Sequence, residues 1–163
     1  MVENGASNGV LSVEPPHSIA QARVDDKGRL MLPSEFLEYL KKLGVDKVFI
    51  TTVDLELARI YSISVWKSNE NLFDNAGDLA ETAEDVAYIA KHFGGDSEID
   101  AQGRVLVPTE LRRRLGLEAA PVWLDCYHGR INIASKTVHE GRLHRAMANI
   151  GEKVKTLEKK GLK

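Results

Sequence analysis

A short motif occurs twice in the chain, and this repetition constrains the fold more than any other feature. Residues 25–33 read Asp-Asp-Lys-Gly-Arg-Leu-Met-Leu-Pro, and residues 100–108 read Asp-Ala-Gln-Gly-Arg-Val-Leu-Val-Pro. The two copies are 75 positions apart, and their Asp, Gly, Arg and Pro residues coincide. Because self-similarity of this kind is typical of a duplicated structural unit, we predict two copies of the order strand, turn, strand, short helix, strand, strand.

Each motif has the composition of a tight hairpin turn followed by a strand. The carboxylates of Asp25 and Asp100 can accept hydrogen bonds from the backbone two residues on, and Gly28 and Gly103 can adopt the left-handed conformation that follows. After each glycine, aliphatic residues occupy alternate positions, which indicates a strand with one buried and one outward face. The arginine of each motif therefore lies just beyond a hairpin tip, on the outward face.

The proline that ends each motif indicates the start of a helix. Pro33 and Pro108 have no N–H group to donate to a sheet, so they should end the strands and open helices over residues 34–43 and 109–115. The expected fold class is α+β and mainly β.

The segments around the two motifs differ in composition from the repeats. The N-terminal segment is rich in Gly, Ser, Asn and Pro, which is typical of a flexible arm. Apolar residues at helical spacing predict helices in the linker (Leu79, Ala83, Val86, Ala87, Ala90) and in the tail (Leu143, Met147, Ile150, Val154, Leu157). The predicted divisions are an arm at 1–17, a first repeat at 18–70, an acidic helical linker at 71–96, a second repeat at 97–140 and a helical tail at 141–163.

Acidic residues are concentrated in one part of the chain. The formal net charge of −2 by itself argues against a nucleic-acid partner. Residues 68–100, however, contain nine acidic residues and one basic residue, and the rest of the chain contains 15 acidic and 21 basic residues. This segregation allows a basic face outside the acidic segment, as phosphate binding requires.

Several classes of function lack their sequence signals. No apolar run reaches the roughly 18–20 residues of a membrane span, and the N-terminus has no secretion signal, so we expect a cytoplasmic, nucleoid-associated protein without a membrane partner. The single cysteine, Cys126, cannot form an internal disulfide, and together with His128 it falls short of a zinc site. Because no catalytic or phosphate-binding motif is present, we expect no enzyme activity, no cofactor, no metal and no small-molecule substrate.

The paired motifs, continued by Thr-Glu-Leu-Arg at 109–112, resemble the signatures of the MraZ family, whose members carry two AbrB-like (SpoVT-AbrB) domains in one chain. The resemblance covers roughly residues 18–139 and includes Trp66, where the family usually has tryptophan. It implies a duplicated swapped-hairpin fold. It also implies a sequence-specific transcriptional regulator that assembles into a ring-shaped homo-oligomer, binds direct repeats in its own promoter and represses a cluster of division and cell-wall genes.

The resemblance also assigns roles to individual positions. The family's Asp-x-x-x-Arg element falls on Asp25 and Arg29 in the first copy and on Asp100 and Arg104 in the second. Leu37 replaces the arginine that the family usually carries on the first short helix, whereas the second helix keeps that arginine as residue 112.

We predict that the hairpin tips bind double-stranded DNA. A two-stranded ribbon fits the major groove, and an arginine that pairs bidentately with guanine contributes about 1–3 kcal/mol of base discrimination. The candidate DNA-binding residues are Arg23, Lys27, Arg29, Arg104 and Arg112, and the residues that shape the turns are Asp25, Gly28, Pro33, Asp100, Gly103 and Pro108. Identical tips on an oligomer would bind successive DNA repeats, since effective concentration raises affinity without new contacts.

Other roles for these residues remain open at this point. Arg29 could simply pair with Asp25 and stiffen the turn, Arg104 could serve subunit contacts, and the arginine run at 112–114 could be an exposed basic helix face. For the whole protein, the alternatives are an AbrB-type antitoxin that binds a toxin through its C-terminal tail and a structural ring module that does not bind DNA.

Overall fold

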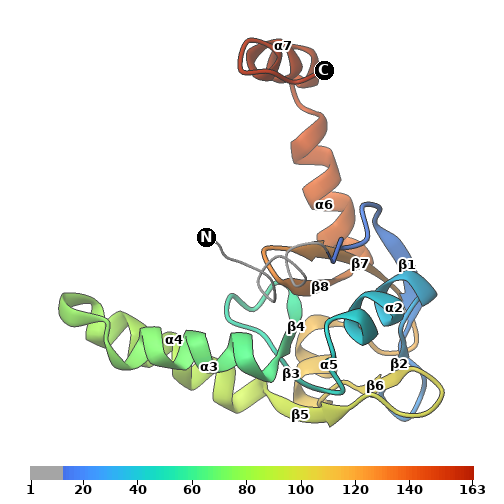
Figure 1. Cartoon of the computed structure of the whole chain (residues 1–163), viewed down its shortest axis with the longest axis vertical. Coiled ribbons are helices and arrows are strands. Elements are labelled where there is room, and N and C mark those ends of the chain that lie inside the picture. The colour runs from blue at the N-terminus through green and yellow to red at the C-terminus, as the bar shows by residue number, and fades with distance from the viewer. Residues whose placement is uncertain (1–12) are drawn as a thin grey trace, which may run out of the picture.

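The computed structural model describes residues 13–163, and Figure 1 shows a body of strands and short helices from which two helical segments extend. The first part contains β1 (Ala20–Arg23), β2 (Arg29–Met31), α2 (Ser34–Lys42), β3 (Lys47–Thr51) and β4 (Ala58–Ser62). It is followed by α3 (Ile63–Asp74), the 3-10 helix η1 (Gly77–Leu79) and α4 (Ala80–Phe93). The second part contains β5 (Gly95–Glu98), β6 (Arg104–Leu106), α5 (Thr109–Leu115), β7 (Pro121–Tyr127), β8 (Arg130–Ser135), α6 (Lys136–Met147) and α7 (Ile150–Glu158).

The class is α+β, as predicted, and the order strand, turn, strand, helix, strand, strand occurs in residues 20–62 and again in residues 95–135. Strands from these two halves interleave in a large antiparallel sheet with the order β1-β7-β8-β4-β3-β5. β1 pairs with β7, and β5 pairs with β3, so the first strand of each half extends the strands of the other half. β2 and β6 form a separate two-stranded antiparallel ribbon.

The hydrophobic core is shared by the two halves. On the ribbon, the four aliphatic residues that alternation assigned to the inward face are all buried: Leu30, Leu32, Val105 and Val107. They belong to one cluster with residues of the short helices and of the large sheet, among them Phe36, Leu111, Val48, Ile50, Leu124 and Ile133. Because this single apolar cluster contains residues of both repeats, the ribbon packs against side chains from both halves of the chain.

The short helices begin where the prolines predict. The carbonyl of Pro33 accepts a hydrogen bond from Phe36 N at 2.9 Å, and the carbonyl of Pro108 accepts one from Arg112 N at the same distance. A proline at this position costs the helix no hydrogen bond, because the first N–H groups of a helix have no partner within it. The predicted starts at residues 34 and 109 are confirmed.

The linker differs from the single helix predicted for residues 71–96. α3 already begins at Ile63, within the predicted first repeat, and it turns back at residues 75–79 into the antiparallel α4 (Figure 1). Ser62 caps α3 by accepting a hydrogen bond from Val65 N at 3.3 Å, and Gly77, with a φ of 59°, lies in the turn. Apolar spacing revealed the inner face of α4 but gave no signal for the reversal, and Leu79 is exposed at the turn.

The tail also contains a break that its apolar spacing did not predict. α6 begins at Lys136, where the Ser135 hydroxyl accepts a hydrogen bond from Val138 N at 3.2 Å, so the predicted division after residue 140 falls inside a helix. Asn149, with a φ of 52°, separates α6 from α7. Asparagine tolerates this left-handed conformation better than most residues.

Of the predicted N-terminal arm, residues 1–12 lie outside the described part of the chain. No helix within residues 13–163 has both the length and the apolar character needed to cross a membrane.

Candidate nucleic-acid interface

The outward face of the β2–β6 ribbon carries two arginines and two apolar side chains. In the antiparallel register, Arg29 lies opposite Leu106, and Met31 lies opposite Arg104. The side chains of Met31 and Leu106 are 49% and 51% exposed, and they occupy the outward positions because the alternate residues of the same strands are buried. The ribbon therefore presents a mixed surface in which each arginine neighbours an exposed aliphatic side chain of the other strand.

In the first turn, Asp25 holds the side chain of Arg29. Asp25 Oδ1 accepts hydrogen bonds from the backbone N–H groups of Lys27 at 2.9 Å and Arg29 at 2.8 Å. Its other oxygen, Oδ2, accepts a bond from Arg29 Nε at 2.9 Å. The backbone hydrogen bond from Arg29 is the largest of the effects that hold the pKa of Asp25 below its usual value, so this carboxylate stays ionised near neutral pH.

The second turn repeats these contacts. Asp100 Oδ1 accepts hydrogen bonds from Gln102 N at 2.9 Å and Arg104 N at 2.8 Å, and Oδ2 accepts one from Arg104 Nε at 2.8 Å. The pKa of Asp100 is lowered for the same reason, above all by the backbone hydrogen bond from Arg104. Within residues 13–163, the side chains of both arginines donate through Nε alone, so their two Nη groups remain available to a partner.

The two turns contact the opposite repeat through their glycines. The Gly28 carbonyl accepts a hydrogen bond from Val107 N at 2.8 Å, and the Gly103 carbonyl accepts one from Leu32 N at 3.1 Å. Gly28 has a φ of 84° and Gly103 a φ of 80°, which confirms the predicted left-handed conformation. A Cβ atom on Gly28 would overlap the guanidinium of Arg112, so this glycine is required by its contact as well as by its backbone.

Arg112 differs from the other candidate DNA-binding residues in being buried. The residue is only 8% exposed. Its Nη1 donates a hydrogen bond to the Val107 carbonyl at 2.7 Å, and its Nε lies 3.4 Å from Glu118 Oε2. The guanidinium therefore lies against the first turn, bonded within the protein. Its neighbours Arg113 and Arg114 are exposed.

One sequence signal could have revealed the burial of Arg112. The equivalent position in the first repeat is Leu37, whose Cδ2 atom would lie 2.6 Å from a Cβ atom on Gly103. Each short helix thus places one side chain against the turn glycine of the other repeat, and a position that accepts leucine in one copy is an inward position in both.

The positive charge is unequally divided between the two tips. Arg23, Lys27 and Arg29 belong to the first tip, where Lys27 is exposed and Arg23 Nη1 donates a hydrogen bond to the Ala119 carbonyl at 3.1 Å. The equivalent residues of the second tip are Glu98, Gln102 and Arg104. The first tip is therefore the stronger candidate for contact with a polyanion.

No group of three or more His, Cys, Asp or Glu side chains within residues 13–163 is arranged to hold a metal ion. The Cys126 thiol is half-buried, and this burial is the main reason that its pKa is raised to about 11, so the thiol is protonated at neutral pH.

No protein-family model matches the sequence, but curated proteins do. The chain is 33% identical over 138 residues to the transcriptional regulator MraZ of Acetivibrio thermocellus, an alignment that covers 74% of this chain and 91% of the relative. It is 34% identical over 90 residues to the protein of that name from Acidobacterium capsulatum, covering 55% of this chain and 62% of the relative, which is less than two thirds of its length. The MraZ of Solidesulfovibrio magneticus is 29% identical over 140 residues, covering 85% and 91%.

Proposed function

The chain belongs to the MraZ family of transcriptional regulators, and we propose that it regulates transcription by binding promoter DNA through the outward face of the β2–β6 ribbon. The observation that carries this proposal is the pair of arginines whose Nε atoms are fixed by the turn aspartates. With Nε held by the aspartate, the two Nη groups would be free to donate to a base, and two N–H groups are what bidentate pairing with guanine O6 and N7 uses.

The apolar residues of the ribbon support the same role. A two-stranded ribbon enters the major groove of B-DNA, where the thymine methyl group is the main apolar feature. Met31 and Leu106 are exposed on the face that carries the arginines, so they would contact such methyl groups beside the bases that the arginines read. The site proposed for DNA thus consists of Arg23, Lys27, Arg29, Arg104, Met31 and Leu106, held in place by the two turns.

We further infer that the exchanged first strands are the swapped hairpins of two AbrB-like half-barrels, since β1 and β5 each pair with the opposite half. A single ribbon offers few phosphate contacts and would bind weakly. A ring-shaped homo-oligomer that binds direct repeats in its own promoter would combine several ribbons, which raises affinity by effective concentration. In this proposal the bound ring represses the division and cell-wall gene cluster that follows the promoter.

The experiment compares Arg29→Ala with wild-type protein in binding to the DNA upstream of its own gene, by fluorescence anisotropy at fixed salt. We expect specific affinity to be lost, while the assembled mass in gel filtration with light scattering stays the same. Lys41→Ala removes an exposed cation on α2, away from the ribbon, and serves as the control. Full affinity of Arg29→Ala would contradict the proposal.

A structural ring module is the second candidate, because the pairing of Arg29 with Asp25 by itself also stiffens the turn. In that case, Arg29→Ala would reduce the stability of the protein, and wild-type protein would not distinguish its upstream DNA from a scrambled sequence.

A further inference from the structure

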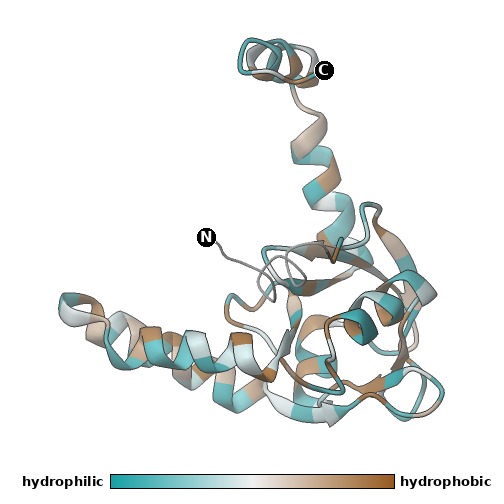
Figure 2. Ribbon diagram, in the orientation of Figure 1, coloured by the Kyte–Doolittle hydropathy of each residue, from teal (hydrophilic) through white to brown (hydrophobic). Residues whose placement is uncertain are grey.

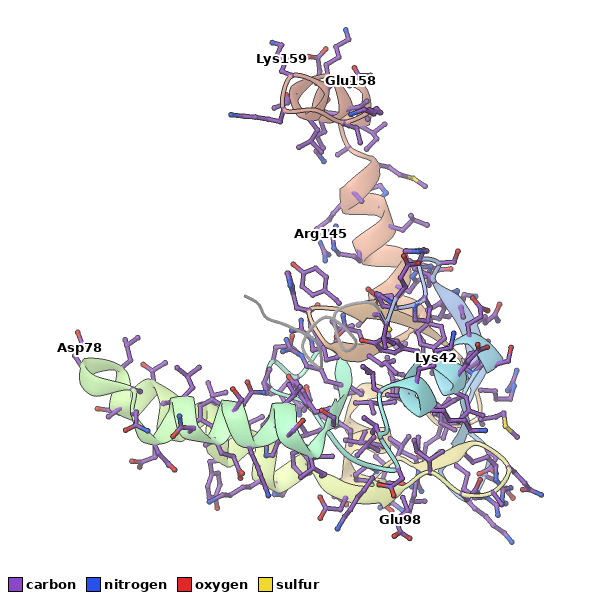
Figure 3. The ribbon with its side chains drawn as sticks, in the orientation of Figure 1. Lys42, Asp78, Glu98, Arg145, Glu158 and Lys159 are labelled. Carbon is purple, nitrogen blue, oxygen red and sulfur yellow. The ribbon has the colours of Figure 1, made fainter. Side chains whose placement is uncertain are left out.

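Two helical arms extend from the body in different directions (Figure 1). We call residues 63–93, with α3 and α4, the acidic arm, and residues 136–163, with α6 and α7, the basic arm. Figure 3 shows Asp78 at the free end of the acidic arm and Lys159 at the far end of the basic arm. Neither arm shares the ribbon, so DNA binding as proposed above leaves both of them uncovered.

The acidic arm combines negative charge with an exposed aromatic side chain. It contains two basic residues, Lys67 and Lys91, and six acidic ones: Glu70, Asp74, Asp78, Glu81, Glu84 and Asp85. Tyr88 of α4 is 74% exposed. Helical spacing places Glu81, Glu84 and Asp85 on the same face of α4 as Tyr88. On the C-terminal side of Tyr88 the same face carries Lys91 and His92, so the carboxylates lie on one side of the tyrosine only. Exposed tyrosine is enriched at protein interfaces relative to the rest of the surface.

The basic arm has the complementary composition. It contains three acidic residues and eight basic ones: Lys136, Arg142, Arg145, Lys153, Lys155, Lys159, Lys160 and Lys163. Ile150, Val154 and Leu157 follow one another at intervals of four and three on α7, and all are exposed. Figure 2 shows apolar residues interspersed with polar ones along both helices of this arm. Lys153 lies beside the apolar stripe on one flank and Glu158 lies beside it on the other, whereas Lys155 is on the opposite side of α7. Lys159 caps the C-terminal end of the helix, and Lys160 follows in the turn after it.

The duplication shows that the basic arm lacks a covering helix. Ser62 caps α3 and Ser135 caps α6 in the same way, directly after the last strand of each repeat. α3 is packed against α4. Within residues 13–163, no helix packs on α6 in that manner, and α7 lies beyond the far end of α6, away from the body (Figure 1).

We propose that the apolar stripe of α7 in one copy of this chain docks on the Tyr88 face of α4 in the next copy. The two surfaces differ and lie on separate arms, so the contact is head-to-tail, and a series of such contacts forms a ring when the rotation between copies closes. This inference rests on one part of the proposed function, the homo-oligomer, and it names the interface that holds the copies together.

The experiment measures assembly in the absence of DNA by light scattering at low ionic strength. Glu84→Lys/Asp85→Lys reverses the charge beside Tyr88, and Lys153→Glu/Lys160→Glu reverses it beside the stripe on α7 and in the turn after that helix. We expect each variant alone to lose the mass of the wild-type assembly while circular dichroism shows unchanged folding, since all four side chains are exposed. The one contact that is removed joins Lys153 Nζ to the carbonyls of Arg145 and Ala146, at 3.4 and 3.5 Å, at the exposed junction of α6 and α7. Lys155→Glu/Lys159→Glu is the matched control, on the opposite side of the same helix and at its C-terminal end, and it should assemble as the wild type does.

An equimolar mixture of the two charge-reversed variants is the decisive measurement. Each basic surface then meets an acidic one on the other variant, so the wild-type mass should return. Local damage to either helix would not be repaired by mixing. A monomeric wild-type protein, assembly that survives either reversal, or a mixture that stays dissociated would overturn the proposal. The proposal on DNA is tested separately by Arg29→Ala, which leaves both arms intact.

Discussion

At the scale of single residues, the two turns depend on glycines that are required for two separate reasons. Gly28 needs a positive φ, and it also lies against the guanidinium of a buried arginine, so a side chain at this position would be strained and would displace Arg112 from the Val107 carbonyl. Gly44 has a similar φ of 73° with open space around its Cα. Comparison of these glycines separates backbone strain from the loss of a contact.

We predict that Gly44→Ala lowers the free energy of unfolding by about 1–2 kcal/mol, the usual cost of the left-handed conformation. Gly28→Ala should lower it by about 1.5–3 kcal/mol more, because the hydrogen bond of a charged donor is lost as well. Urea denaturation measures both values. Equal losses for the two variants would show that Arg112 does not support the first turn.

The same contact predicts the behaviour of a second variant. Arg112→Leu introduces the residue that the first repeat has at the equivalent position, and the guanidinium that it removes is buried. We expect operator affinity, measured by anisotropy, to stay at the wild-type value while stability falls. A loss of affinity in a folded protein would show that Arg112 takes part in DNA binding.

At the scale of elements, the sequence predicted what depends on short-range chemistry. The turn glycines, the helix starts at Ser34 and Thr109 and the buried face of the ribbon each follow from residues a few positions apart. The exchange of β1 and β5 between the halves depends on pairing between residues about a hundred positions apart for β1 and about fifty for β5, which no local pattern records. The buried arginine escaped prediction because a charged residue on a short helix is usually exposed.

The turn aspartates give the hairpins a defined pH dependence. The pKa values of Asp25 and Asp100 are lower in the folded protein than their ordinary value of 3.8. The stability that they contribute is therefore fully present above that value and is lost as the pH falls below it. We predict that Asp25→Asn is less stable than the wild type at pH 7 and that this difference shrinks toward pH 3, measured by urea denaturation. A difference that stays constant with pH would contradict the role of the carboxylate.

At the scale of the whole molecule, the ribbon and the two arms occupy separate parts of the surface (Figure 1). This separation allows DNA binding and assembly to act together, since a ring would present many ribbons at once. The segregation of charge favours both DNA binding and assembly, because the acidic residues that make the net charge −2 are concentrated in the segment 68–100 and not at the first tip.

Assembly predicts a steep dependence of DNA affinity on salt. Each phosphate neutralised on duplex DNA contributes about 0.9 to the slope of log affinity against log salt concentration. One first tip offers three cations, Arg23, Lys27 and Arg29, so a ring should give a slope several times that of a single chain. Titrations of wild-type protein at several salt concentrations measure this slope. A slope that one chain could produce would contradict binding through many tips.

The central claim, that Arg29 reads guanine from the groove, is tested most directly by changing one atom of the DNA. Replacement of operator guanines by 7-deazaguanine removes the N7 acceptor and keeps base pairing. We predict that this replacement weakens binding of wild-type protein, within the roughly 1–3 kcal/mol of a bidentate pair, and has no further effect on Arg29→Ala. An equal loss for both proteins, or no loss for the wild type, would contradict the claim.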